Sequence, residues 1–164
     1  MQPGTALIPE FDQETAGTRR MLERIPADAL NFRPHEKSWT LGQLATHCGQ
    51  LLSWTRPTLE LNELDIANIP PARERTTPES ILRHFDEQRA DARAALEAAS
   101  AAVMAEPWTM RAGEREFFTL PKMVCIRTFV FNHSVHHRGQ LSVYLRLLDI
   151  PVPGVYGPTA DEAM

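Results

Sequence analysis

Residues 132–141 of this 164-residue chain read Asn-His-Ser-Val-His-His-Arg-Gly-Gln-Leu, and apolar residues continue the pattern on both sides. An α-helix turns by about 100° per residue, so the stretch can be placed on a helical wheel. One stripe about 80° wide then contains Ile126, Val130, His133, His137, Leu141, Tyr144 and Leu148. His133 and His137 therefore lie one turn apart on the apolar face, and we expect both to point into the protein.

Two imidazoles buried side by side need partners for their ring nitrogens. An unpaired buried donor or acceptor costs about 1–3 kcal/mol, and protonating both rings would place like charges together. One divalent metal ion can bind a nitrogen of each ring, and the i,i+4 spacing is that of HExxH zinc helices. The glutamate of that motif is absent between His133 and His137, which argues against a zincin-type protease. Hydrogen bonds to water and backbone, without a metal, are the alternative.

His47 is the third candidate ligand. It lies on the apolar face of a second helix, which begins near Ser38–Thr40 with a capping box formed by Thr40 and Gln43. An inward histidine is also compatible with simple hydrogen bonding in the core. If all three histidines bind one ion, coordination positions stay open, as in catalytic rather than structural sites. Three neutral imidazoles leave the charge of the ion uncompensated, which favours an anionic fourth ligand.

Several neighbouring residues have weaker claims to the site. His136 lies about 60° from His133 and forms an alternative i,i+3 pair with it. Three polar residues are candidates to orient a ligand, or else belong to solvated helix faces: Gln140, Glu14 and Asp12. Arg138 is expected to face outward or to pair with an acid, and Tyr144 to pack or to line a pocket. No residue is identified as a catalytic acid or base.

The spacing of apolar residues predicts four helices in one domain covering residues 1–164. They span about 8–25, 38–57, 77–103 and 119–148, with prolines near three of the ends. The connection from Asn62 to Thr77 has about 16 residues and is long enough to run the length of a helix. A weak β-hairpin signal lies at residues 106–118. The predicted fold is nevertheless all-α: a four-helix bundle with a long crossover between its second and third helices.

Composition narrows the classes of function and location. The net charge of −4 lacks the positive field that nucleic-acid binding needs. Cys48 and Cys125 both neighbour apolar residues, so we expect buried thiols in a reducing compartment. We find no signal peptide and no apolar run of about 18 residues that would span a bilayer. A cytoplasmic protein without nucleic-acid or membrane partners is expected.

Three stretches resemble the DinB family: Asn132–Leu141, which is similar to its HxxxHRGQ helix, Ser38–His47, and the tail Asp149–Glu162. The resemblance implies a four-helix bundle of up-down-down-up topology, usually a homodimer. It also implies a divalent ion, zinc, nickel or iron, bound by His47, His133 and His137. Members of the family include transferases and isomerases that use low-molecular-weight thiols.

The expected function is therefore a metal-dependent enzyme acting on a small-molecule substrate with a small thiol, of S-transferase or isomerase type. One alternative is a hydrolase in which the ion activates water. A second is a non-catalytic metal-binding module of a stress response, which would have a filled coordination sphere and no adjacent pocket. A third is a metal-free bundle. Fold alone does not choose between them.

Overall fold

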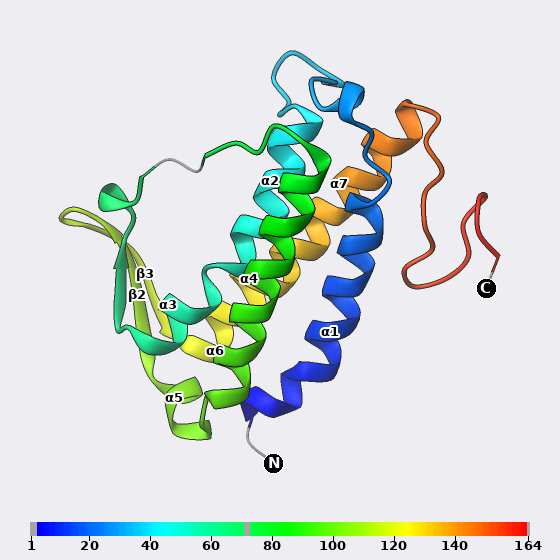
Figure 1. The fold of residues 1–164 in the computed structure, drawn as a ribbon. Coiled ribbons are helices and arrows are strands. Elements are labelled where there is room, and N and C mark those ends of the chain that lie inside the picture. Colours follow the sequence, from blue (N-terminus) through cyan, green and yellow to red (C-terminus); the bar gives the residue numbers. More distant parts are fainter. Residues whose placement is uncertain (1–2, 71–72, 164) are drawn as a thin grey trace.

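The computed structural model describes residues 3–70 and 73–163, and it is mostly helical (Figure 1). Its main helices are α1 (Pro3–Leu22), α2 (Leu41–Leu52), α4 (Pro78–Ala98) and α7 (His133–Leu147). Shorter helical segments are η1 (Ala27–Ala29), α3 (Thr55–Glu60), η2 (Ile66–Asn68), α5 (Ala101–Ala105), α6 (Lys122–Cys125) and the π-helix η3 (Ile126–Asn132). The strands are β1 (Glu63–Asp65), β2 (Pro107–Ala112) and β3 (Arg115–Pro121).

The four main helices surround one apolar core. Both α4 and α7 pack against α1 and against α2. In Figure 1, α1 and α7 run in one direction, and α2 and α4 run in the other. Large side chains with less than 2% exposure fill this core. They come from α1 (Phe11 and Leu22), α2 (Leu44), α4 (Phe85) and the π-helix η3 that leads into α7 (Ile126). The antiparallel contact of α2 with α7 is the one that positions the histidines.

Capping residues fix where α2 and α4 begin. The predicted capping box of α2 is confirmed: the Gln43 N–H donates to Thr40 Oγ1 at 3.1 Å, and the Thr40 N–H donates to Gln43 Oε1 at 3.0 Å. Thr77 and Ser80 form the same reciprocal bonds at the start of α4, where Pro78 occupies the first turn. Each box satisfies backbone donors that a helix start leaves free.

Three predicted helices are shorter than expected or interrupted. The second ends at Leu52, and Pro57 lies in the first turn of α3, where its missing N–H removes no helical bond. The third ends at Ala98, and Ser100 caps the separate helix α5. The fourth begins at Lys122, because residues 119–121 belong to β3. It also contains a π-helical turn directly before His133, and π-turns are frequent at functional sites.

A small three-stranded sheet corrects the all-α prediction. β2 and β3 form an antiparallel hairpin that begins in the region of the weak hairpin signal and extends beyond it to Pro121, and Gly113 turns the chain at a φ of +58°. β1 pairs in parallel with the other edge of β2, so that the strand order is β1-β2-β3. Because β1 has three residues and its partner lies more than 40 positions away, its pairing leaves no local signal. Trp108, Met110 and Cys125 form a second small core beside the sheet.

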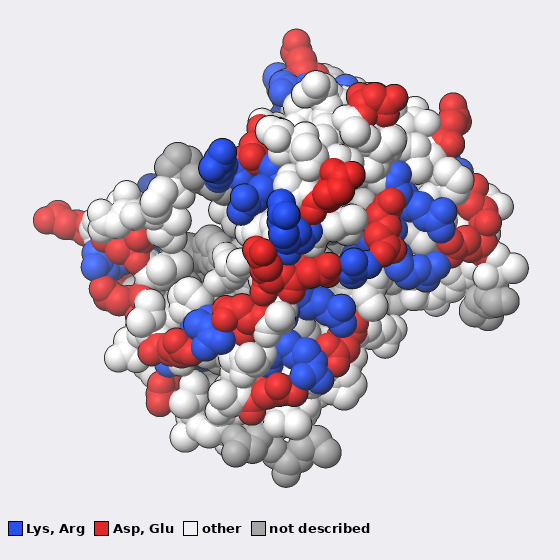
Figure 2. Space-filling view, viewed as in Figure 1, with Lys and Arg blue, Asp and Glu red and all other residues white. Residues whose placement is uncertain are grey.

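Charges of both signs alternate over the face shown in Figure 2, without a large patch of one sign. Ion pairs link α4 to its neighbours: Arg19–Asp86 and Arg93–Asp12 to α1, and Arg56–Asp91 to α3. Within residues 3–70 and 73–163, no helix combines the length and the apolar character that crossing a membrane requires.

Candidate metal centre

The structure brings together the three histidines that the sequence singles out. His47 comes from α2, and His133 and His137 come from successive turns of α7. One nitrogen of each ring lies within 4.8 Å of the other two. The Nε2 atoms of His133 and His137 are 2.9 Å apart, and the His47 ring centroid is 4.7 Å from that of His137. The group could hold one metal ion.

Two glutamines orient two of these rings. Gln50 Oε1 lies 3.3 Å from His47 Nδ1, and Gln140 Oε1 lies 2.7 Å from His137 Nδ1. An amide oxygen only accepts hydrogen bonds, so each contact favours the tautomer with hydrogen on Nδ1 and a free lone pair on Nε2. Gln140 was a candidate to orient a ligand, with a solvated helix face as the alternative, and its contact with His137 supports the first; Gln50 was not singled out. The signal for it is a repeated spacing, His47-Cys48-Gly49-Gln50 and His137-Arg138-Gly139-Gln140.

We predict that Gln50→Leu and Gln140→Leu each lower the affinity for zinc by about 10–100-fold, because metal sites lose that much when a partner orienting a ligand is removed. Competition with a chromophoric chelator measures the dissociation constant. Gln13→Leu is the matched control, since Gln13 is exposed on α1. Zinc affinities equal to that of the wild type in both glutamine variants would contradict the tautomer assignment.

The protonation states of the three rings fit a cation. Burial lowers the pKa of His47 and His133 and lowers that of His137 to about 4, so all three are neutral at pH 7. With hydrogen on its Nδ1, His137 presents an Nε2 lone pair to Nε2 of His133 at 2.9 Å. Their separation is close to the roughly 3.3 Å between two nitrogens bound to one tetrahedral zinc at 2.0–2.1 Å. The donor set therefore fits a divalent transition metal.

The lowered pKa values predict how the stability of chelator-treated protein depends on pH. Between about pH 6.5 and the folded pKa of His137 near 4, the unfolded chain binds more protons than the folded chain. The free energy of unfolding should therefore fall as the pH decreases through this window. Above the window, these rings should cause no pH dependence of stability. Urea denaturation at several pH values measures this fall. His137→Gln is the control, and an equally steep fall in that variant would contradict the prediction.

Trp39 covers the histidines and separates two surface hollows. Its ring stacks on His137 with centroids 5.7 Å apart and meets His47 edge-on at 4.9 Å. The hollow on one side, the His47 hollow, has a volume of about 730 Å³ and is lined by Trp39, Gln43, Thr46, His47, Gln50 and Glu74. The other, the His137 hollow, measures about 590 Å³ and is lined by Lys37, Ser38, Trp39, Leu44, His137, Gln140 and Tyr144. The three-histidine group is thus accessible from two sides.

Glu14, Asp12 and Arg138 do not orient the histidines. Arg138 is 3% exposed and donates to the Glu14 carboxylate at 2.6 Å and to the Glu14 carbonyl at 2.8 Å. The Tyr156 hydroxyl donates to the same carboxylate at 2.6 Å, which fastens the C-terminal tail to α1 and α7. Asp12 pairs with Arg93. Both acids pair with arginines, so of the alternatives left open for them the structure does not support orientation of a ligand, whereas the pairing of Arg138 with an acid is confirmed.

The remaining histidines and the nearby cysteine lie outside the group. His136 is exposed, with its ring centroid 6.5 Å from that of His133. His84 packs against Gly49 on α2. Cys48 is 1% exposed, and burial raises the pKa of its thiol to about 12. Cys48 is therefore neither a metal ligand nor a nucleophile here.

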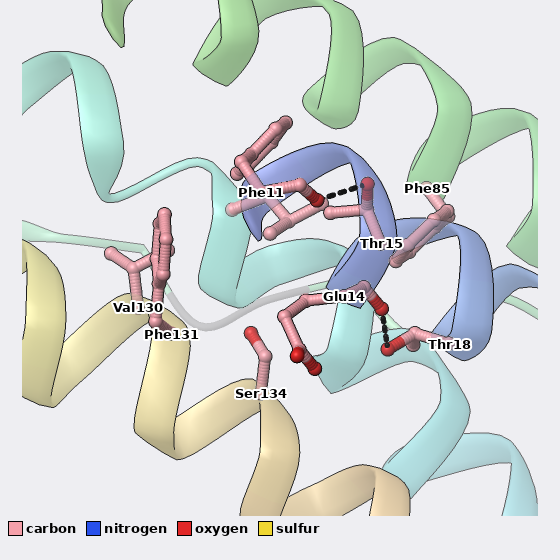
Figure 3. Close-up of a pocket in the computed structure, with 9 residues that line it drawn as sticks. Phe11, Glu14, Thr15, Thr18, Phe85, Val130, Phe131 and Ser134 are labelled. Atoms are coloured by element: carbon pink, nitrogen blue, oxygen red, sulfur yellow. Dashed lines mark hydrogen bonds between the residues drawn. The ribbon is translucent and has the colours of Figure 1, made fainter. Parts of the chain in front are cut away.

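A small internal cavity is lined by residues such as Phe11, Phe85 and Phe131 (Figure 3). It lies between α1, α4 and the chain around residues 130–134, and its walls are largely apolar. Its volume of about 270 Å³ includes space open to solvent, and only a small part of it can hold a water molecule. None of the three clustered histidines lines it, so the hollows beside Trp39 are the routes to the candidate metal centre.

Comparison with known proteins finds similarity in both sequence and fold. The model of the DinB family matches residues 1–163. YrdA of Bacillus subtilis is 25% identical over 158 residues, which cover 94% of this chain and 89% of YrdA. The crystal structure of a DinB-like protein from Bacillus cereus is 21% identical, with a TM-score of 0.70 over 92% of this chain and 95% of that one. A DinB-like protein from Bacillus subtilis is 16% identical, with a TM-score of 0.73 over 92% and 97%.

Proposed function

The chain belongs to the DinB family, and we propose that it is a metal-dependent enzyme acting with a small thiol, of S-transferase or isomerase type. His47, His133 and His137 would hold one divalent ion of zinc, nickel or iron. The observation that carries the proposal is the pair of hollows that reach the histidines from two sides. A closed structural site would have no such access.

The described side chains at the site have two roles: the histidines would bind the ion, and their neighbours orient or shield the histidine rings. When bound, a divalent ion supplies the positive charge that stabilises a thiolate, which is the nucleophilic form of a thiol. Gln50 and Gln140 hold two rings with Nε2 available, and Trp39 shields one face of His137 from water. Because both cysteines are buried, the thiol has to come from a small molecule.

We also propose that α1, α2, α4 and α7 form the up-down-down-up four-helix bundle implied by the family resemblance. The directions of these helices in Figure 1 and their contacts around one core support this topology. The homodimer and the cytoplasmic location stay predictions.

Turnover of an electrophile by metal-loaded protein tests the proposed activity. Zinc-, nickel- and iron-loaded samples are assayed with 1-chloro-2,4-dinitrobenzene and either cysteine, glutathione, bacillithiol or mycothiol. We expect turnover with at least one thiol and none after the substitution His137→Ala. The control is His136→Ala, which changes the exposed neighbouring histidine and should keep the turnover. Hydrolysis of ester substrates without any thiol would favour the hydrolase. Binding of the ion with neither activity would favour the non-catalytic module.

A further inference from the structure

We infer that the thiol carries a carboxylate and occupies the His137 hollow, where Lys37 selects it, while Glu74 excludes anions from the His47 hollow. The inference rests on the proposed function, because it names the chemical class of thiol that the site would take. It makes Lys37 and Glu74 specificity-determining residues. Neither residue was singled out by the sequence.

Trp39 lines both hollows, but the other lining residues give the two hollows opposite charges. Lys37 is the one charged residue that lines the His137 hollow, whose other polar groups come from Ser38, Gln140 and Tyr144. Glu74 is the one charged residue that lines the His47 hollow. Within residues 3–70 and 73–163, most surface charges near α4 are neutralised by ion pairs, but neither Lys37 nor Glu74 forms one. Each is therefore available to a ligand.

The position of Glu74 is fixed by the segment around it. The N–H of Arg75 donates to Thr46 Oγ1 at 3.1 Å, which ties this segment to the side of α2 that carries His47. The Glu74 carboxylate lies so close to Gly42 that a Cβ there would be 3.4 Å from its Oε1. The negative charge thus sits over the first turn of α2, a position that the helix dipole favours. An anion entering the His47 hollow meets this charge.

The charged residue that lines each hollow determines which hollow an anionic thiol enters. A cation held by three neutral imidazoles attracts an anion from either hollow, and Trp39 separates the two approaches. Lys37 adds attraction on the side of His137, and Glu74 adds repulsion on the side of His47. Lys37 and His137 both line the His137 hollow, so a chain can join a thiol at the ion to a carboxylate at Lys37. The predicted ligand class for the His137 hollow is a mercaptocarboxylate rather than a neutral or cationic thiol.

Calorimetric titration of zinc-loaded protein tests this class with three thiols of equal length: 6-mercaptohexanoate, 6-mercaptohexanol and 6-aminohexanethiol. For the wild type we expect the acid to bind about threefold or more tightly than the alcohol, since an exposed charge has a modest effect. The amine gains nothing from Lys37, so Lys37→Gln should not weaken its binding. Lys37→Gln should remove the preference for the acid and leave the affinity for the alcohol unchanged. Glu74→Gln should leave the acid binding as tightly as before or more tightly.

Arg33→Gln is the control for a general effect of charge, because Arg33 is exposed in the same loop as Lys37 but lines neither hollow. Zinc content is measured in every sample. Equal affinity for the three thiols in the wild type, or a preference for the acid that survives Lys37→Gln, would overturn the inference while the thiol function stands. Failure of all three thiols to bind zinc-loaded protein would instead overturn the proposed function.

Discussion

Wild-type protein loaded with zinc and dialysed should retain about one ion per chain, and His137→Ala should retain none. His137 is central to the group, because its Nε2 faces that of His133 at 2.9 Å and its ring lies against that of His47. Loss of this ring leaves two nitrogens, and the affinity should fall by more than the roughly 10–100-fold expected for the loss of an orienting partner. Elemental analysis of the purified protein measures the content.

The matched control for this prediction is His136→Ala. His136 adjoins His137 in sequence, but its ring is exposed and outside the group, so the zinc content should match the wild type. His47→Ala tests the contribution of α2 and should also lose the ion. Retention of a full equivalent by His137→Ala, or loss of zinc from His136→Ala alone, would mean that the i,i+3 pair His133 and His136 is the binding pair.

Removing the buried guanidinium by Arg138→Met should lower the free energy of unfolding by about 3 kcal/mol. Breaking a buried ion pair from one side costs about 3–5 kcal/mol because the other charge stays unpaired. Glu14 would then keep its carboxylate in a site where its side chain is 14% exposed, with only Tyr156 donating to it. Urea denaturation of metal-free protein measures the change.

Arg93→Met is the comparison for the Arg138 variant, since the pair of Arg93 with Asp12 is partly exposed and should contribute far less to stability than the buried pair. The double variant Glu14→Leu with Arg138→Met should regain part of the lost stability, because no charge then stays buried. If Arg138→Met were no less stable than Arg93→Met, the buried pair would not hold the tail, α1 and α7 together.

Part of the candidate site could be predicted from local sequence patterns. The apolar stripe around His133 and His137 and the capping box at Thr40 could be predicted, because both depend on residues three or four positions apart in one helix. The same reasoning could have found Gln50, which repeats the spacing of His137 and Gln140. It left the role of Glu14 open, since an acid on α1 has several helices within reach and only packing shows that it pairs with Arg138.

The amino-acid sequence by itself determined the helical periodicity, the helix starts after Thr40 and Thr77 and the inward direction of three histidines. Those features are set by rotation along a single helix and by hydrogen bonds within one turn. Only the tertiary structure decided that β1 pairs with β2, that Arg138 is buried on Glu14, and that Trp39 divides the approach to His47 and His137. These contacts join segments distant in the chain, so they depend on how the helices pack rather than on any local pattern.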